Sequence, residues 1–317
     1  MFTAIYDRFL DISTVASIPI ELFGMYVVYR YSPPNMESLH FFILNVMAWN
    51  LLGNLAGSLV HIHPLFPAEC LRADGLTGMF TGNDLVAYVI FAVIGLSVLN
   101  FALASVLAFP YRYVLVVYPD LADKVRRKWC AAACGILHTG CSLIALWFYT
   151  ILIVRFDDYR FNGERPDPHG VFCFQPSGFM KCLLGILALI VTSGLIAIIV
   201  VFSILLRRHL RKVVLTYNTR TLNSQRKFLR YLMIIVLVPV TFVGIPLLLA
   251  LSCGAFPAVP YSREIFMATT VLLYNHGTLF SIVSIVSFKP YWQAVRRMGS
   301  KFMELFHSSN TSVFVMK

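Results

Sequence analysis

Seven apolar runs, each long enough to cross a bilayer, constrain this chain more than any other feature. A transmembrane helix needs about 20 consecutive apolar residues. Within lipid such a run has to be helical, because a helix satisfies all of its own backbone hydrogen bonds. The runs lie at 10–30, 39–62, 85–113, 131–154, 179–206, 229–251 and 263–288.

The composition agrees with a bilayer as the main solvent. Of the 317 residues, 58% are hydrophobic and 13% are charged, and a soluble domain of this size cannot bury so much apolar surface. The N-terminus carries Asp7 and Asp11 and shows no small-residue cleavage site, so we expect no removable signal peptide. Because we find no internal repeat or linker, we predict a single domain over residues 1–317. This domain is an all-α membrane protein, a bundle of seven helices followed by a tail at 289–317.

Lys and Arg are concentrated on one side of the predicted topology. Of the 26 basic residues, 19 fall in segments on one side of the membrane and seven on the other. An excess of Lys and Arg marks the cytoplasmic side, so we predict an extracellular N-terminus and a cytoplasmic C-terminus. The net charge of +11 is then mostly this bias, and we do not expect nucleic acid as a partner.

Basic residues gather near the predicted inner ends of the third, fifth and sixth runs. Arg112 closes the third run in FPYRYVLVVYP, where a guanidinium can simply reach the lipid headgroups. RRHLRK follows the fifth run and QRKFLR precedes the sixth. These two arms could bind anionic headgroups, dock a cytosolic partner, or do both.

The sixth run contains two prolines, Pro239 and Pro246, seven residues apart. Each proline removes a backbone hydrogen bond and can kink the helix. Seven residues make about two turns, so both prolines lie on one face. The pattern indicates a moving helix, although static packing is also compatible with it.

The first two runs carry small and polar residues that suggest close helix contacts. Gly53 and Gly57 form a G-x-x-x-G pair, which favours contact within the bundle but could also serve a receptor dimer. The polar residues of the second run, which we expect to face other helices, are Asn45, Trp49, Asn50, Asn54 and His61. Glu21 lies inside the first run. An acid at membrane depth is costly and is a functional candidate, or it is neutral or hydrogen-bonded to a neighbour.

Three segments together resemble the nematode serpentine chemoreceptors of class H. They are IPIELFGMYVVYRYSPPNM, FILNVMAWNLLGNL and HGTLFSIVSIVSFKPYW, and the paired prolines of the sixth run fit the same pattern. The resemblance covers nearly the whole chain. Two positions depart from it: Glu21 stands where His is common, and Trp292 follows Pro-Tyr where Arg is common.

The resemblance implies a chemosensory G-protein-coupled receptor that binds a small ligand from outside and activates a heterotrimeric G protein. It implies a location in the plasma membrane of sensory neurons or their cilia, and no cofactor or metal. On this reading Arg112 at the end of the third run meets the G protein, and Pro239 and Pro246 are the switch of the sixth helix. The members of the basic arms that we assign to coupling are Arg208, Arg211, Arg226 and Lys227.

We expect the ligand pocket to open outward between the third, fifth, sixth and seventh helices. Its candidate lining residues are Tyr88, Phe91, Thr270, Tyr274 and Glu21. Each aromatic side chain among them could instead contact lipid or the bundle core. Cys70 and Cys173 both face the oxidising side in this topology, and we predict that they form a disulfide; the alternative is two free thiols.

A transporter or channel is the alternative function. Such proteins usually show repeat symmetry, paired broken helices or a chain of buried charges, and we find no repeat and only one clear acid within a run. We also find no H-E-x-x-H, G-x-S-x-G or P-loop motif, so we do not expect an enzyme.

Overall fold

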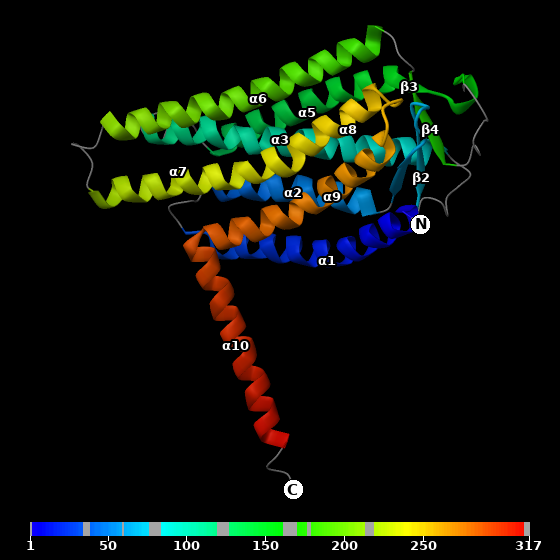
Figure 1. The fold of residues 1–317 in the computed structure, drawn as a ribbon. Helices are drawn as coiled ribbons and strands as arrows, with labels where there is room; N and C mark the ends of the chain where they lie inside the picture. Colours follow the sequence, from blue (N-terminus) through cyan, green and yellow to red (C-terminus); the bar gives the residue numbers. More distant parts are fainter. Residues whose placement is uncertain are drawn as a thin grey trace.

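The computed structural model describes residues 2–33, 39–58, 60–75, 84–118, 127–160, 170–175, 179–212 and 219–313. In this part of the chain, seven helices or helix pairs are long and apolar enough to cross a membrane, which confirms the predicted fold. They run side by side in one bundle (Figure 1). They are α1 (Phe2–Tyr31), α2 (Leu39–Ser58), α3 (Asp84–Val117), α5 (Arg127–Leu152), α6 (Phe179–Lys212), α7 (Thr219–Pro239) with α8 (Ile245–Ala255), and α9 (Ser262–Ser287).

Several helix ends differ from those predicted. The second helix ends at Ser58, and His61, which we expected on that helix, lies on a strand. The third helix continues to Val117, so Arg112 lies within it and not at its end. The fifth continues to Lys212. Long basic side chains can keep their charge in the headgroup region while the helix continues, so an apolar run underestimates the length of the helix.

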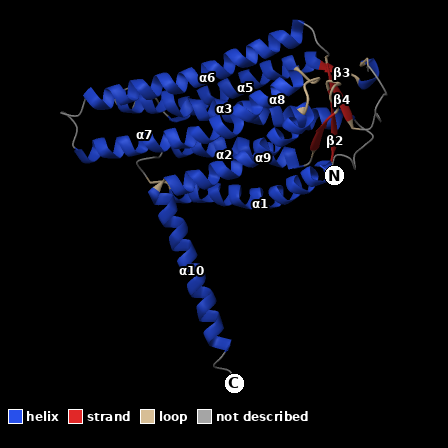
Figure 2. Ribbon diagram, viewed as in Figure 1, coloured by secondary structure: helices blue, strands red, loops and turns tan. Residues whose placement is uncertain are grey.

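A four-stranded antiparallel sheet lies at one end of the bundle (Figure 2). The sequence analysis did not predict it. Its strands, in the spatial order β1-β2-β4-β3, are β1 (His61–Pro64), β2 (Cys70–Asp74), β4 (Val171–Phe174) and β3 (Ile153–Val154). Pro64 is tolerated because β1 is an edge strand. We call this the sheet end of the bundle, and we call the opposite end, where α6 ends and α7 begins, the basic end.

Glycines allow close contacts of α1 with α9, of α2 with α3, and of α2 with α9. A Cβ atom added at Gly53 on α2 would lie 3.2 Å from the side chain of Ser97 on α3. A Cβ added at Gly24 on α1 would lie 3.1 Å from Ser281 on α9. Both glycines of the G-x-x-x-G pair therefore pack within the bundle, since Gly57 lies against α9 in the same way.

The sixth transmembrane helix is interrupted between its two prolines. A π-helical segment, η5 (Val240–Gly244), separates α7 from α8. Both Pro239 and Pro246 are buried, so they face the bundle. The Thr241 hydroxyl donates to the carbonyls of Leu237 and Val238 at 2.8 and 3.2 Å, which satisfies acceptors near the break. Short π segments within α-helices are frequent at functional sites.

Helix α10 (Lys289–Val313) leaves the basic end of the bundle at a steep angle (Figure 1). Its first turn is held by Tyr291, which is fully buried and whose hydroxyl lies 2.7 Å from the Ser32 hydroxyl at the end of α1. Burial raises the pKa of Tyr291 to about 12. The α9 helix ends at Ser287, one residue before the predicted end of the seventh run at 288.

Candidate functional site

At the sheet end, Cys70 on β2 and Cys173 on β4 are joined by a disulfide. The two residues pair directly across the strands, and both are fully buried. The bond spans 103 residues of sequence and ties the segment after α2 to the segment before α6. The sheet therefore connects transmembrane helices that are distant in the sequence.

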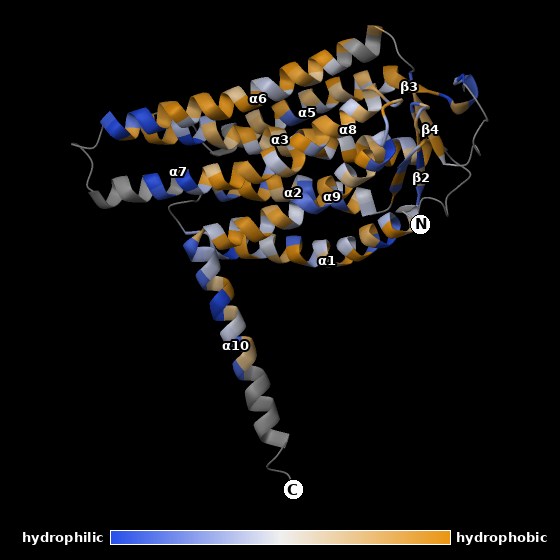
Figure 3. Cartoon of the chain, in the orientation of Figure 1, coloured by the Kyte–Doolittle hydropathy of each residue, from blue (hydrophilic) through white to orange (hydrophobic). Residues whose placement is uncertain are grey.

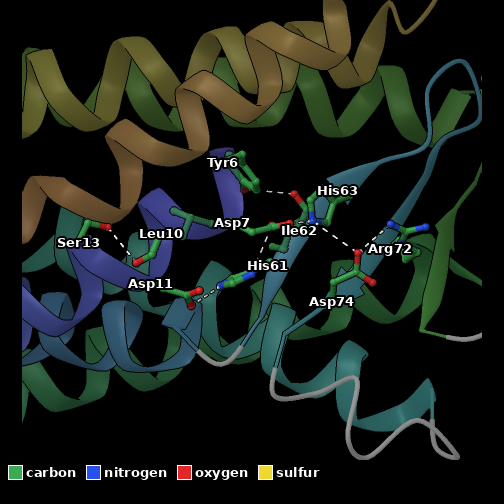
Figure 4. Close-up of polar contacts among 10 residues, drawn as sticks. All are labelled: Tyr6, Asp7, Leu10, Asp11, Ser13, His61, Ile62, His63, Arg72 and Asp74. Carbon is green, nitrogen blue, oxygen red and sulfur yellow. Dashed lines mark hydrogen bonds and ion pairs between the residues drawn. The ribbon is translucent and has the colours of Figure 1, made fainter. Parts of the chain in front are cut away.

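Charged side chains fix the first turns of α1 to the sheet (Figure 4). Asp7 Oδ1 lies 3.4 Å from His61 Nδ1 and 3.0 Å from His63 Nε2. Asp11 Oδ1 lies 3.2 Å from His61 Nε2, and Asp74 Oδ2 lies 3.5 Å from His63 Nε2 and 2.8 Å from a guanidinium nitrogen of Arg72. Burial lowers the pKa of His63, although the two neighbouring carboxylates act to raise it. His61 and His63 are two residues apart in the segment HIHP, so on a strand both side chains point to the same face.

Two of the predicted ligand residues, Tyr88 and Phe91 on α3, lie against the sheet. The Tyr88 hydroxyl donates to the Val154 carbonyl at 3.1 Å. The Phe91 ring centroid lies 5.2 Å from that of Phe172 and 5.7 Å from that of Phe174. These aromatic side chains join α3 to β3 and β4.

Thr270 and Tyr274 lie on α9. Thr270 is buried, and its hydroxyl donates to the Phe266 carbonyl at 2.8 Å. The Tyr274 ring covers Gly57 on α2, because a Cβ atom at Gly57 would lie 2.6 Å from it. The Tyr274 hydroxyl is buried and accepts or donates no hydrogen bond among the residues that the structure describes.

Glu21 is buried at membrane depth, with 1% of its surface exposed. The Asn54 amide on α2 donates to Glu21 Oε1. A side chain at Gly277 on α9 would overlap both groups, so three helices meet at this carboxyl group. Within the described ranges, Glu21 Oε2 and the amide of Asn50, one turn from Asn54, have no hydrogen-bond partner.

Among the residues that the structure describes, the predicted ligand residues therefore lie in two separate sets of contacts. Tyr88 and Phe91 pack on the sheet, whereas Glu21 and Tyr274 lie where α1, α2 and α9 meet. The sequence analysis did not assign Gly277 to the Glu21 contact. The sequence did contain a signal for this contact, because Gly277 lies within the seventh apolar run, and small residues in membrane helices allow two helices to approach closely.

A second polar network links α2, α3 and α5, and through it Asn45 and Trp49 face another helix, as the sequence analysis expected. The sequence analysis did not name the other members of this network. His138 Nδ1 lies 2.6 Å from Asn100 Oδ1, and its Nε2 lies 3.1 Å from the Asn45 amide nitrogen. The Asn100 amide also donates to Ser142 at 2.8 Å, and the Trp49 ring stacks on His138. The members of this network lie in three separate apolar runs, so no spacing within one run indicates that they meet. Only the packing of the helices brings them together.

A hollow of about 360 Å³ opens at the sheet end, between the turn after β1 and the loop that joins α8 to α9. None of the predicted ligand residues lines it. Its walls are formed by Phe66, Pro67, Pro257, Ala258, Val259, Tyr261, Ser262, Arg263 and Glu264.

The basic end is formed by α3, α6 and α7. Tyr113 and Val116 on α3 pack against Leu206 and Leu210 on α6 and Leu229 on α7, and Arg112 lies half-buried beside them. Hydrophilic residues cover the ends of α6 and α7 (Figure 3). The exposed basic residues there are Arg207, Arg208, Arg211, Lys212, Arg226, Lys227 and Arg230.

Seven helices of membrane-spanning length, the sixth containing a π-helical segment, place the chain among the multi-pass membrane proteins. The chain matches the family model of the serpentine type 7TM GPCR chemoreceptor Srh over residues 3–301, and it belongs to this family. The family is generally non-enzymatic. A comparison with curated proteins found no match.

Proposed function

We propose that this protein is a chemosensory receptor that binds a small molecule at the sheet end and activates a heterotrimeric G protein at the basic end. The observation that carries the proposal is the π segment between Pro239 and Pro246, in a chain that belongs to the Srh family. Short π segments within α-helices are frequent at functional sites, and on this proposal ligand binding shifts the sixth helix between two arrangements that differ at this segment.

We place the sheet end outside the cell and the basic end in the cytosol, in the plasma membrane of sensory neurons or their cilia. The distribution of Lys and Arg supports this orientation. The Cys70–Cys173 disulfide supports it independently, because disulfides persist on the oxidising side of the membrane. A transporter or channel has no specific support from the geometry.

On the ligand side, we retain Glu21, Tyr88, Phe91, Thr270 and Tyr274 as candidate contacts. Glu21 and Tyr274 are supported by their buried polar atoms, which lack partners among the described residues. Buried polar groups of this kind commonly bind water or a ligand. Tyr88 and Phe91 connect the sheet to α3, so a ligand at the sheet could act on α3 through them.

On the cytosolic side, Arg112 is the proposed centre of coupling. It is half-buried where α3, α6 and α7 converge, so movement of α7 would change its surroundings. A G protein that binds only the open arrangement must in turn raise the affinity for ligand. Arg208, Arg211, Arg226 and Lys227 would supply the surrounding positive surface.

The proposal is tested by a ligand screen with a G-protein activation readout in transfected cells. Arg112→Ala should reach the cell surface and bind ligand but signal poorly. Its ligand affinity should lose the increase caused by the G protein, typically about 5–150-fold. Arg8→Ala, an exposed arginine on α1 at the sheet end, is the matched control. Parent-like signalling by Arg112→Ala at equal surface expression would leave Arg112 as a headgroup anchor only. An uptake or electrical response that persists without any G protein would favour the transporter or channel.

A further inference from the structure

The hollow at the sheet end combines apolar walls with two charges of opposite sign. Phe66, Pro67, Pro257, Val259 and Tyr261 supply aromatic, proline and aliphatic surface. The volume of about 360 Å³ lies at the small end of the range for ligand pockets, which begins at about 300 Å³. The volume is therefore sufficient for a small organic molecule.

The charges come from Arg263 and Glu264 in the first turn of α9. Both side chains are exposed and line the hollow. Among the residues that the structure describes, neither takes part in an ion pair or a side-chain hydrogen bond. Three other charged residues of the sheet end, Asp7, Asp74 and Arg72, do take part in ion pairs.

The loop that forms most of the hollow is held by its own hydrogen bonds. The Ser262 hydroxyl donates to the Pro257 carbonyl at 2.9 Å, and the Ile265 amide donates to the Tyr261 carbonyl at 2.9 Å. Tyr261 has a left-handed backbone with φ of 63°, which is rare for a residue with a bulky side chain. Such a conformation persists where the surrounding structure fixes it, often at ligand sites, and here it accompanies a ring that is 75% exposed.

We propose that this hollow binds a small zwitterion with an apolar body, of the type of an apolar amino acid. Its carboxylate pairs with Arg263, its ammonium group pairs with Glu264, and its apolar part covers Tyr261 and the prolines. A ligand with one charge would satisfy one of these side chains and be repelled by the other. The inference names the ligand class of the proposed receptor and so rests on the proposed function.

The test compares four probes on the full chain in lipid nanodiscs, with saturation-transfer NMR as the measurement and empty nanodiscs as background. L-Phenylalanine carries both charges, 3-phenylpropionate only the carboxylate, and phenethylamine only the ammonium group; glycine lacks the apolar body. We expect L-phenylalanine to bind more tightly than each of the other three, by roughly two- to fivefold for a missing charge, as for an exposed charge pair, and by roughly three- to tenfold for the missing apolar body.

Two substitutions that each remove one charge should weaken the binding of different probes. Arg263→Gln should weaken the binding of L-phenylalanine and 3-phenylpropionate by roughly two- to fivefold and leave the binding of phenethylamine unchanged. Glu264→Gln should weaken L-phenylalanine and phenethylamine and leave 3-phenylpropionate unchanged. Arg8→Gln, an exposed arginine at the same end, should change none of them.

The proposal is overturned if the probes bind equally, if no probe exceeds the empty nanodiscs, or if both variants weaken all probes alike. Both substitutions are on exposed side chains, and an unchanged thermal unfolding midpoint verifies that each variant is folded. The measurement uses no G protein. A failure here therefore leaves the signalling test of Arg112 intact, and a failure of that test leaves this binding result intact.

Discussion

The contact between α1, α2 and α9 depends on the absence of a side chain at Gly277. A Cβ atom there would overlap the Glu21 carboxylate and the Asn54 amide. We predict that Gly277→Ala destabilises the receptor by about 1–3 kcal/mol, because extra volume in a packed core forces neighbours out of place. The measurement is the thermal unfolding midpoint of the purified receptor in detergent.

The matched control is Gly95→Ala on α3, where a Cβ atom meets nothing within 4 Å. This change should leave the midpoint unchanged or raise it, since alanine is favoured over glycine within a helix by about 0.5–1 kcal/mol. Equal midpoints for the two variants would show that α9 does not approach Glu21 as closely as the structure indicates.

At the scale of elements, the Cys70–Cys173 disulfide closes a long segment that includes α3 and α5. We predict that Cys70→Ser destabilises the receptor by about 2–4 kcal/mol, mainly because the unfolded chain gains freedom. Cys173→Ser should have the same effect, and the double variant should be no worse than either single one. Alkylation of both cysteines without prior reduction, seen by mass spectrometry, would contradict the bond.

The contact between α1 and the sheet should depend on pH through His63. Burial lowers the pKa of His63 below the usual value of 6.5, so the folded chain binds this proton less readily than the unfolded chain does. The stability that results is present above the usual value and is lost as the pH falls through the lowered pKa. We predict that the unfolding midpoint of the parent falls over this range.

The variant His63→Gln isolates this effect, since glutamine does not titrate. The midpoint of this variant should change less with pH below 6.5 than that of the parent. If His63→Gln and the parent have the same pH profile, the acid sensitivity arises from other groups.

At the scale of the whole molecule, the orientation decides which end meets the ligand. We predict that an epitope tag before residue 2 is accessible on intact cells, and that a tag after residue 317 is accessible only after permeabilisation. The reason is the excess of Lys and Arg at the basic end, from which α10 departs. The opposite labelling pattern would move the hollow and the disulfide into the cytosol and would contradict the proposed function.

The sequence alone determined the number of spans and the class of protein. Length and hydropathy are local properties, and a bilayer allows an apolar run of this length only one structure, a helix. The same locality explains why Pro239 and Pro246 marked the break in the sixth helix, because proline disrupts the backbone wherever it is placed. The resemblance to class H receptors rested on such local patterns and agrees with the family match.

Only the tertiary structure decided which side chains meet. The sheet pairs residues 61–64 with 71–74 and residues 70–72 with 171–173, and no local pattern specifies such distant pairings. Glu21 was recognisable as a costly buried acid, but its partners Asn54 and Gly277 come from two other helices. The hollow beside Arg263 and Glu264 likewise depends on how the turn after β1 approaches the loop before α9. Contacts of this kind depend on the packing of whole helices, a property that no single run of sequence contains.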